Sequence, residues 1–135
     1  MIRFGGVLVV LALALGACSF GPSPLEILES NPMANATVSF AEPTSRIGVD
    51  GNPDPFIGIP SATSFRMSWR PIPTQLVDQG LQELLDQSEE AGFSLELVKR
   101  SEAGDLRFES WEGFDADGIF LQVRLTEDSL SVFLG

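Results

Sequence analysis

One helical pattern followed by four alternating ones occupies the second half of the chain, and this order restricts the fold more than any other feature. Over 75–91, apolar residues such as Val77, Leu81 and Leu84 recur at helical spacing, and acidic and amide side chains lie mostly opposite them. Gly92 suits the left-handed position beyond a helix end. Four strand-like alternating segments follow, at 93–97, 106–109, 119–125 and 130–134. Their hairpin-sized links predict an α+β fold, with one helix packed on an antiparallel β-meander as a two-layer sandwich.

The first half of the chain is less regular. Residues 37–41 alternate like a short strand, and 62–70 alternate again. The apolar face of the second segment consists of Phe65, Met67 and Trp69. Between the two segments, 42–61 contains four prolines and is typical of a long connection. We therefore expect an irregular N-terminal half that contains strands.

Three aromatic residues of the predicted meander fall outside its main apolar phase. They are Trp111, Phe120 and Phe133. An antiparallel sheet usually keeps polar the face that its helix leaves uncovered. Three rings on that face would form an exposed patch of the kind that marks an interaction surface. The alternative is that 37–70 covers them, in which case they belong to the core.

The N-terminus has the parts of a signal peptide. Arg3 and the free amine supply positive charge, and 7–15 is an apolar run. This run is too short to span a hydrocarbon layer, which takes about 20 residues. The run closes at Leu15-Gly16-Ala17-Cys18. Leu15 is too large for an ordinary secretory cleavage site, which takes small side chains at the first and third positions before the cut.

This tetrapeptide resembles the lipobox of bacterial lipoproteins, a family in which the cysteine is lipidated and becomes the mature N-terminus. The resemblance implies a signal peptide over 1–17 and a lipid anchor at Cys18, on the extracytoplasmic face of the cell membrane. Cys18 is the only cysteine, so an internal disulfide is excluded, and lipidation accounts for an unpaired thiol in an exported chain. The alternative is an ordinary signal peptide with an incidental cysteine.

The mature chain divides into a tether and a domain. Residues 18–36 hold three prolines and are predicted to form a lipidated tether, in which Leu25, Ile27 and Leu28 favour a short helical turn against the domain or the bilayer. A single globular domain is expected over 37–135. Its layout resembles that of small actinobacterial lipoproteins.

Composition excludes several functions. The chain has 8 Lys and Arg residues against 19 Asp and Glu, a net charge of −11, which disfavours binding to nucleic acid or to anionic lipid. It has no His and no Tyr. Ser-His and Cys-His nucleophiles and His-based zinc sites are thereby excluded. No glycine-rich phosphate-binding motif occurs either. We expect no catalysis and no cofactor.

One segment has the spacing of a calcium loop. Asp50, Asn52 and Asp54 place oxygen side chains at alternate positions. However, Pro55 and Ser61 stand where an EF-hand loop has Gly and Glu. A simple turn explains the segment better, and no metal site is expected.

The sequence therefore predicts a lipid-anchored, non-catalytic envelope module that binds a protein, lipid or wall component, with an envelope protein as a candidate partner. The alternative function is that of a small-ligand or calcium-binding accessory lipoprotein. A concave pocket lined by Phe65, Trp69 and Trp111 would favour the alternative.

Overall fold

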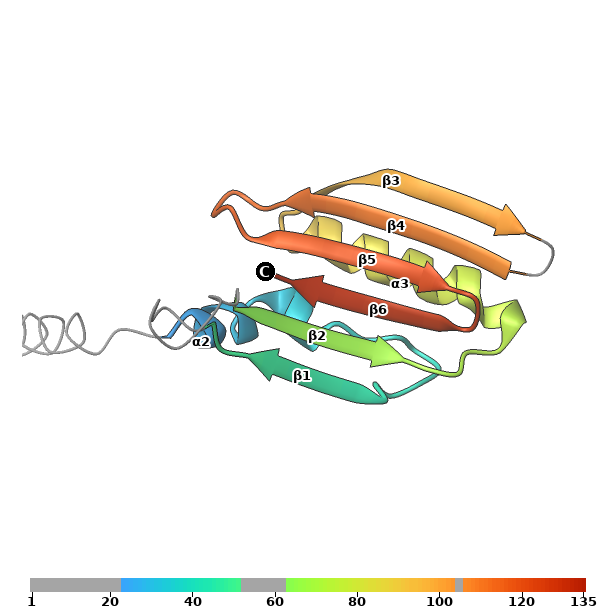
Figure 1. Cartoon of the computed structure of the whole chain (residues 1–135), viewed down its shortest axis with the longest axis horizontal. Coiled ribbons are helices and arrows are strands. Elements are labelled where there is room, and N and C mark those ends of the chain that lie inside the picture. The colour runs from blue at the N-terminus through green and yellow to red at the C-terminus, as the bar shows by residue number, and fades with distance from the viewer. Residues whose placement is uncertain (1–22, 52–62, 104–105) are drawn as a thin grey trace, which may run out of the picture.

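The computed structural model describes residues 23–51, 63–103 and 106–135. The predicted signal peptide, Cys18 and most of the calcium-like segment, with Asn52 and Asp54, lie outside these ranges. Figure 1 shows a broad sheet with one long helix behind it. The sheet has six antiparallel strands in the order β1-β2-β6-β5-β4-β3. The strands are β1 (Ser45–Val49), β2 (Ser64–Trp69), β3 (Ser94–Ala103), β4 (Leu106–Phe114), β5 (Phe120–Thr126) and β6 (Ser129–Leu134).

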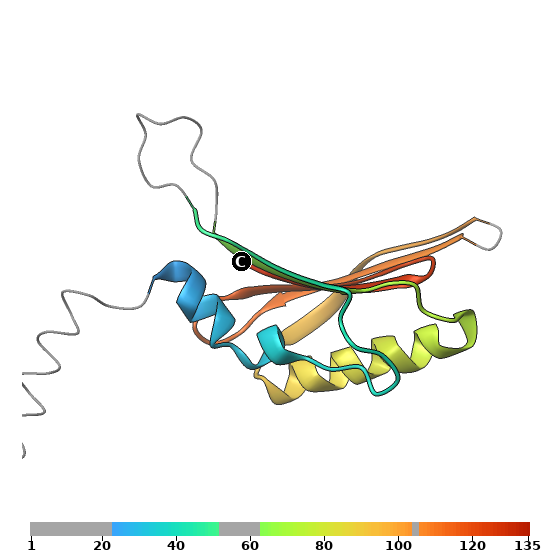
Figure 2. The ribbon, with the colours of Figure 1, turned by 90° about the horizontal axis from the view of Figure 1, so that it is seen from below.

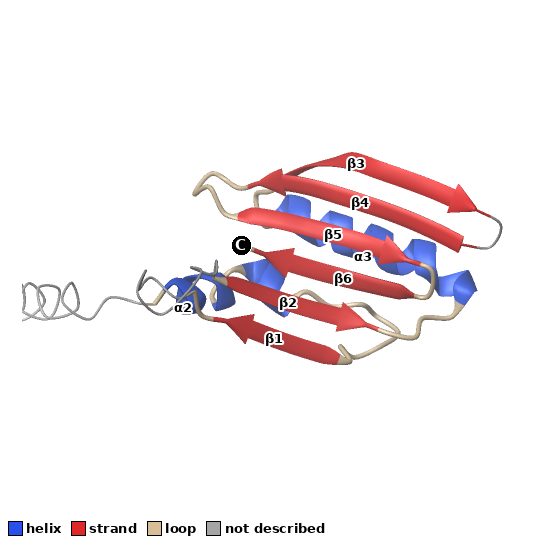
Figure 3. Ribbon diagram, viewed as in Figure 1, coloured by secondary structure: helices blue, strands red, loops and turns tan. Residues whose placement is uncertain are grey.

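All the described helices lie on one face of the sheet. They are α2 (Pro24–Glu29), η1 (Pro32–Asn35), η2 (Thr74–Leu76) and α3 (Val77–Glu90). Seen edge-on in Figure 2, α2, η1 and α3 pack below the strands, and no described helix lies above them. The secondary-structure colouring of Figure 3 shows the same two layers. The predicted α+β architecture, a helix on an antiparallel meander, is confirmed.

The core lies between α3 and the central strands. Leu84 of α3 is fully buried, as are Leu121 and Val123 of β5. Helix and sheet approach closely at Gly80, where a Cβ atom would stand 2.6 Å from Cδ1 of Leu130. Gly92 ends the helix with a φ of 90°, the left-handed conformation that its position in the sequence predicts.

The segment before residue 37 belongs to the packed structure. Ser23 caps α2 by accepting a hydrogen bond from the Glu26 N–H, and Asn31 caps η1 in the same way through the Met33 N–H. Leu28 and Met33 are buried in the core. The helical turn that the sequence favoured is therefore present and packs on the domain. The packed core begins earlier than residue 37, where the sequence placed the domain boundary.

The strands of the first half differ from expectation. Residues 37–41 form only a single bridge, between Val38 and Ala41, whereas β1 lies inside the predicted connection 42–61. β1 could not be predicted from hydrophobic alternation because its apolar residues, Ile47 and Val49, are exposed and do not contribute to the core. Backbone pairing with β2 forms it instead.

Candidate interaction face

The face of the sheet opposite α3 is here called the open face. In each strand, the side chains that do not point toward α3 lie on this face. Successive residues of a strand point to opposite faces, and directly paired residues share a face. Leu121 and Val123 point to α3, so Phe120, Gln122 and Arg124 of β5 point to the open face. The strand register then assigns the open-face side chains of β2, β4 and β6 in the same way.

Three phenylalanine rings from adjacent strands meet on the open face. The ring centres of Phe120 and Phe133 are 6.1 Å apart, and those of Phe114 and Phe120 are 5.5 Å apart. Such tilted and edge-on pairs are favourable aromatic geometries. Phe120 and Phe133 are half-buried, and Phe114 is 59% exposed. These three residues are called the phenylalanine cluster.

Trp111 is not part of this cluster, and the prediction that it shares a face with Phe120 and Phe133 is wrong. It pairs with Val123 and therefore points to the helix side. Within the alternating segment 106–109, the apolar residues Leu106 and Phe108 would be expected to point inward, but the structure has the opposite phase, with Glu109 and Trp111 inward. Because a carboxylate is normally exposed, Glu109 led to the wrong prediction of which β4 residues face α3.

Trp111 lines a separate cleft of about 290 Å³ between the end of α3 and the start of β3. Its neighbours there include Leu85, Phe93 and Leu95. Phe65 and Trp69 are buried in the core instead. The three residues whose shared pocket would favour a small-ligand receptor are therefore not brought together.

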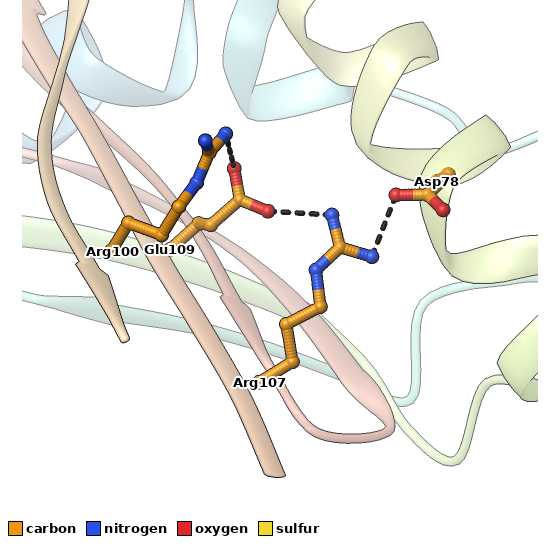
Figure 4. A network of polar contacts seen from close by, with 4 residues as sticks. All are labelled: Asp78, Arg100, Arg107 and Glu109. Atoms are coloured by element: carbon orange, nitrogen blue, oxygen red, sulfur yellow. Dashed lines mark hydrogen bonds and ion pairs between the residues drawn. The ribbon is translucent and has the colours of Figure 1, made fainter. Parts of the chain in front are cut away.

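An ion-pair network explains how Glu109 is accommodated on the helix side (Figure 4). The Glu109 side chain is only 2% exposed. It accepts hydrogen bonds from Arg107 at 2.6 Å and from Arg100 at 3.1 Å. Arg107 also pairs with Asp78 of α3, at 2.7 Å. The network thus attaches the first turn of α3 to β4.

Burial and the two arginines act in opposite directions on Glu109. Burial raises the pKa of its carboxyl, but the hydrogen bonds from Arg107 and Arg100 outweigh burial and leave the pKa below its usual range. The pKa of Arg107 is raised by its hydrogen bonds to Asp78 and Glu109. Both pKa shifts favour the charged forms of Glu109 and Arg107. Both carboxylate oxygens of Glu109 accept hydrogen bonds from arginines within the network, which favours a structural role over a catalytic one.

The open face has a shallow hollow of about 280 Å³ beside the phenylalanine cluster. The residues that line it are Arg66, Phe120, Gln122, Arg124, Ser131 and Phe133. The Arg66 guanidinium lies 5.5 Å from the centre of the Phe133 ring. Arg124 lies at the same distance from Phe108, whose ring Lys99 also approaches at 5.5 Å. These are cation–π contacts.

Among the described residues, the cations of the open face form no ion pair with a carboxylate. In the described ranges, the ion pairs within 4.0 Å involve Arg70, Arg100 and Arg107. Arg66, Lys99 and Arg124 are exposed and have no such partner among those residues. In a chain of net charge −11, the open face therefore brings Arg66, Lys99 and Arg124 beside aromatic rings, without a close ion pair to a described carboxylate.

The sequence predicted two of the three rings of the phenylalanine cluster, Phe120 and Phe133, but not the neighbouring arginines. Phe114 was not predicted to lie on the sheet because it stands in a Gly-Phe-Asp stretch that resembles a turn. Arg66 and Arg124 alternate with the apolar residues of their strands, but polar residues in such positions are equally typical of an ordinary solvent-exposed face. Only the register, which sets β2 beside β6 and β6 beside β5, shows that the two arginines share one hollow.

Comparisons with known proteins add no family. No protein-family model matches the chain, and neither the curated proteins nor the solved structures include a match. Within 23–51, 63–103 and 106–135, no helix is long and apolar enough to cross a membrane. In the same ranges, no group of three or more His, Cys, Asp or Glu residues is arranged to hold a metal ion.

Proposed function

We propose that this protein is a lipid-anchored, non-catalytic module on the extracytoplasmic face of the cell membrane, which binds an envelope partner through the open face. The anchor rests on the lipobox-like Leu15–Cys18. The binding role rests on one observation above all. The phenylalanine cluster and the cations Arg66, Lys99 and Arg124 share a sheet face that none of the described helices covers.

Aromatic and arginine side chains support an interface role on physical grounds. They dominate binding energy at protein interfaces, where they lie near the centre of the contact. Here Phe120, Phe133 and Arg66 lie together, and hydroxyl-bearing side chains such as Ser131 and Ser68 are their neighbours on the sheet. An aromatic and cationic centre with a polar surround is the composition of a binding surface.

The anchor predicts the outcome of a single substitution. Cys18→Ala removes the thiol that would carry diacylglycerol, so we expect the protein to leave the membrane fraction and its lipoprotein-type processing to stop. Two or more acyl chains hold a protein stably at a bilayer, and within the described ranges no helix is long and apolar enough to replace them. Mass spectrometry of the wild-type mature N-terminus checks the same claim. An unmodified cysteine there would contradict it.

Replacing a ring of the cluster separates binding from folding. Phe120→Ser or Phe133→Ser is expected to lower the free energy of unfolding by only about 1 kcal/mol, because each ring is half-buried. Capture of the partner by crosslinking in intact cells should be lost. Ile27→Ser, which removes an exposed apolar side chain from α2, is the matched control and should retain capture.

Thermal unfolding of the same variants provides the contrary outcome. A loss of about 3–5 kcal/mol, typical of a truncated core phenylalanine, would mean that the cluster is part of a core rather than a surface. Normal capture by both serine variants would also contradict the proposed role of the open face.

A further inference from the structure

The hollow beside the phenylalanine cluster is lined by two arginines from strands far apart in the sequence. Arg66 of β2 pairs across the sheet with Phe133 of β6, and Phe133 pairs in turn with Gln122 of β5. Arg124, two residues further along β5, pairs with Ser131. Both arginines line the same hollow. Arginine is suited to planar oxyanions because its N–H groups bind two oxygens at once.

We propose that this hollow binds a carboxylate side chain of an acidic peptide segment in the partner protein, whose neighbouring apolar side chain packs on the phenylalanine cluster. This inference rests on the proposed function and adds the chemistry of the partner. The hollow, about 280 Å³, has room for a carboxylate side chain. The Phe133 ring, which lines the hollow, lies against the Arg66 guanidinium before a ligand arrives, which lowers the entropic cost of ordering this side chain.

The charge pattern around the hollow favours a peptide over an anionic bilayer. Glu112 lies on the open face next to Gln122, from which it accepts a hydrogen bond, and Glu96 pairs with Glu112 on the same face. A uniformly anionic lipid surface that satisfied the arginines would also meet these two carboxylates and be repelled by them. A peptide can place its carboxylate at the arginines and keep its negative charge away from β3.

The test uses the full chain in a neutral detergent and a synthetic peptide as the probe. The peptide is acetylated and amidated and has a phenylalanine between two glutamates, and its matched control has glutamines in place of the glutamates. Binding is followed by NMR through the side-chain N–H signals of Arg66 and Arg124. The variants are Arg66→Gln with Arg124→Gln, which removes two positive charges, and Arg70→Gln, which removes one positive charge outside the hollow.

We expect the glutamate peptide to bind at least about tenfold more tightly than the glutamine peptide, as the loss of charge-assisted hydrogen bonds implies. The preference should disappear in the double variant and persist in Arg70→Gln. Amide spectra check that each variant is folded. Equal binding of the two peptides, equal loss in Arg70→Gln, or no binding at all would overturn the proposal.

A second arm tests the lipid alternative with vesicles of phosphatidylglycerol and phosphatidylcholine. If the vesicles shift the two arginine signals and the glutamate peptide does not, the site recognises lipid phosphate and the peptide proposal is wrong. The proposed function fails separately, since it requires that serine at 120 or 133 abolish capture in cells. If capture depends on the rings but not on the arginines, only the acidic chemistry of the partner is refuted.

Discussion

Replacing Leu84 or Leu121 with alanine is expected to lower the free energy of unfolding by about 2–5 kcal/mol. Both side chains are fully buried, one on α3 and the other on β5, and they belong to the same core. Truncation removes apolar contact and leaves a cavity that the surrounding strands fill only in part. Since small domains are stable by about 5–15 kcal/mol, either change removes a large share of the total.

Chemical denaturation of each variant measures this effect, and Leu106→Ala is the matched control. Leu106 is 54% exposed on β4, so its truncation should cost no more than about 0.5 kcal/mol. Midpoints unchanged in both core variants would mean that α3 does not pack on the sheet as described.

Substitution of Glu109 is expected to have the second large effect, and one that depends on pH. Glu109→Gln leaves Arg107 and Arg100 without their shared carboxylate on the helix side of β4. Loss of one partner from a buried pair costs about 3–5 kcal/mol. Because the Arg100 side chain is 56% exposed and Arg107 keeps Asp78, we expect a smaller loss, about 2–4 kcal/mol at pH 7.

The sign of the pH dependence follows from the lowered pKa of Glu109. A group whose pKa is lower in the folded state stabilises the fold above its unfolded pKa, and this contribution is lost as the pH falls through the folded pKa. The difference in unfolding free energy between wild type and Glu109→Gln should therefore be constant near neutral pH and shrink below about pH 4.5, the ordinary value for the group. Urea denaturation at several pH values measures it.

Glu112→Gln is the control for this series, because Glu112 lies on the opposite face of the same strand and bonds only Ser110 and Gln122 among the described residues. We expect a change near 0.5 kcal/mol for this variant. A Glu109→Gln protein as stable as the wild type, or a difference that grows in acid, would contradict the described network.

The sequence predicted the layers of this fold well because its strongest periodic signals lie where burial is most complete. The helical phase of Leu81 and Leu84 and the strand phase of Leu121 and Val123 are all buried in the structure. β1 and β4 were harder for a common reason. Their apolar and polar residues do not follow burial, since Ile47 is exposed on one and Glu109 is buried on the other.

The candidate site was predictable only in part. Phe120 and Phe133 stand out because large rings in a polar phase are unusual, and their proximity follows from the β5–β6 hairpin. Trp111 was misplaced because the phase of β4 depends on two arginines that neutralise Glu109, a long-range effect that alternation cannot show. The hollow required β2 beside β6, a pairing that skips three strands in the sequence.

The central claim is that the open face is the binding surface of an anchored domain, and site-specific photocrosslinking in intact cells tests it most directly. A photoreactive residue at position 120 is compared with one at position 86, which is exposed on α3 on the other side of the sheet. We expect a discrete adduct from position 120 that disappears when Arg66 and Arg124 are both glutamine, and no adduct from position 86. An adduct from position 86 alone, or none from position 120, would contradict it.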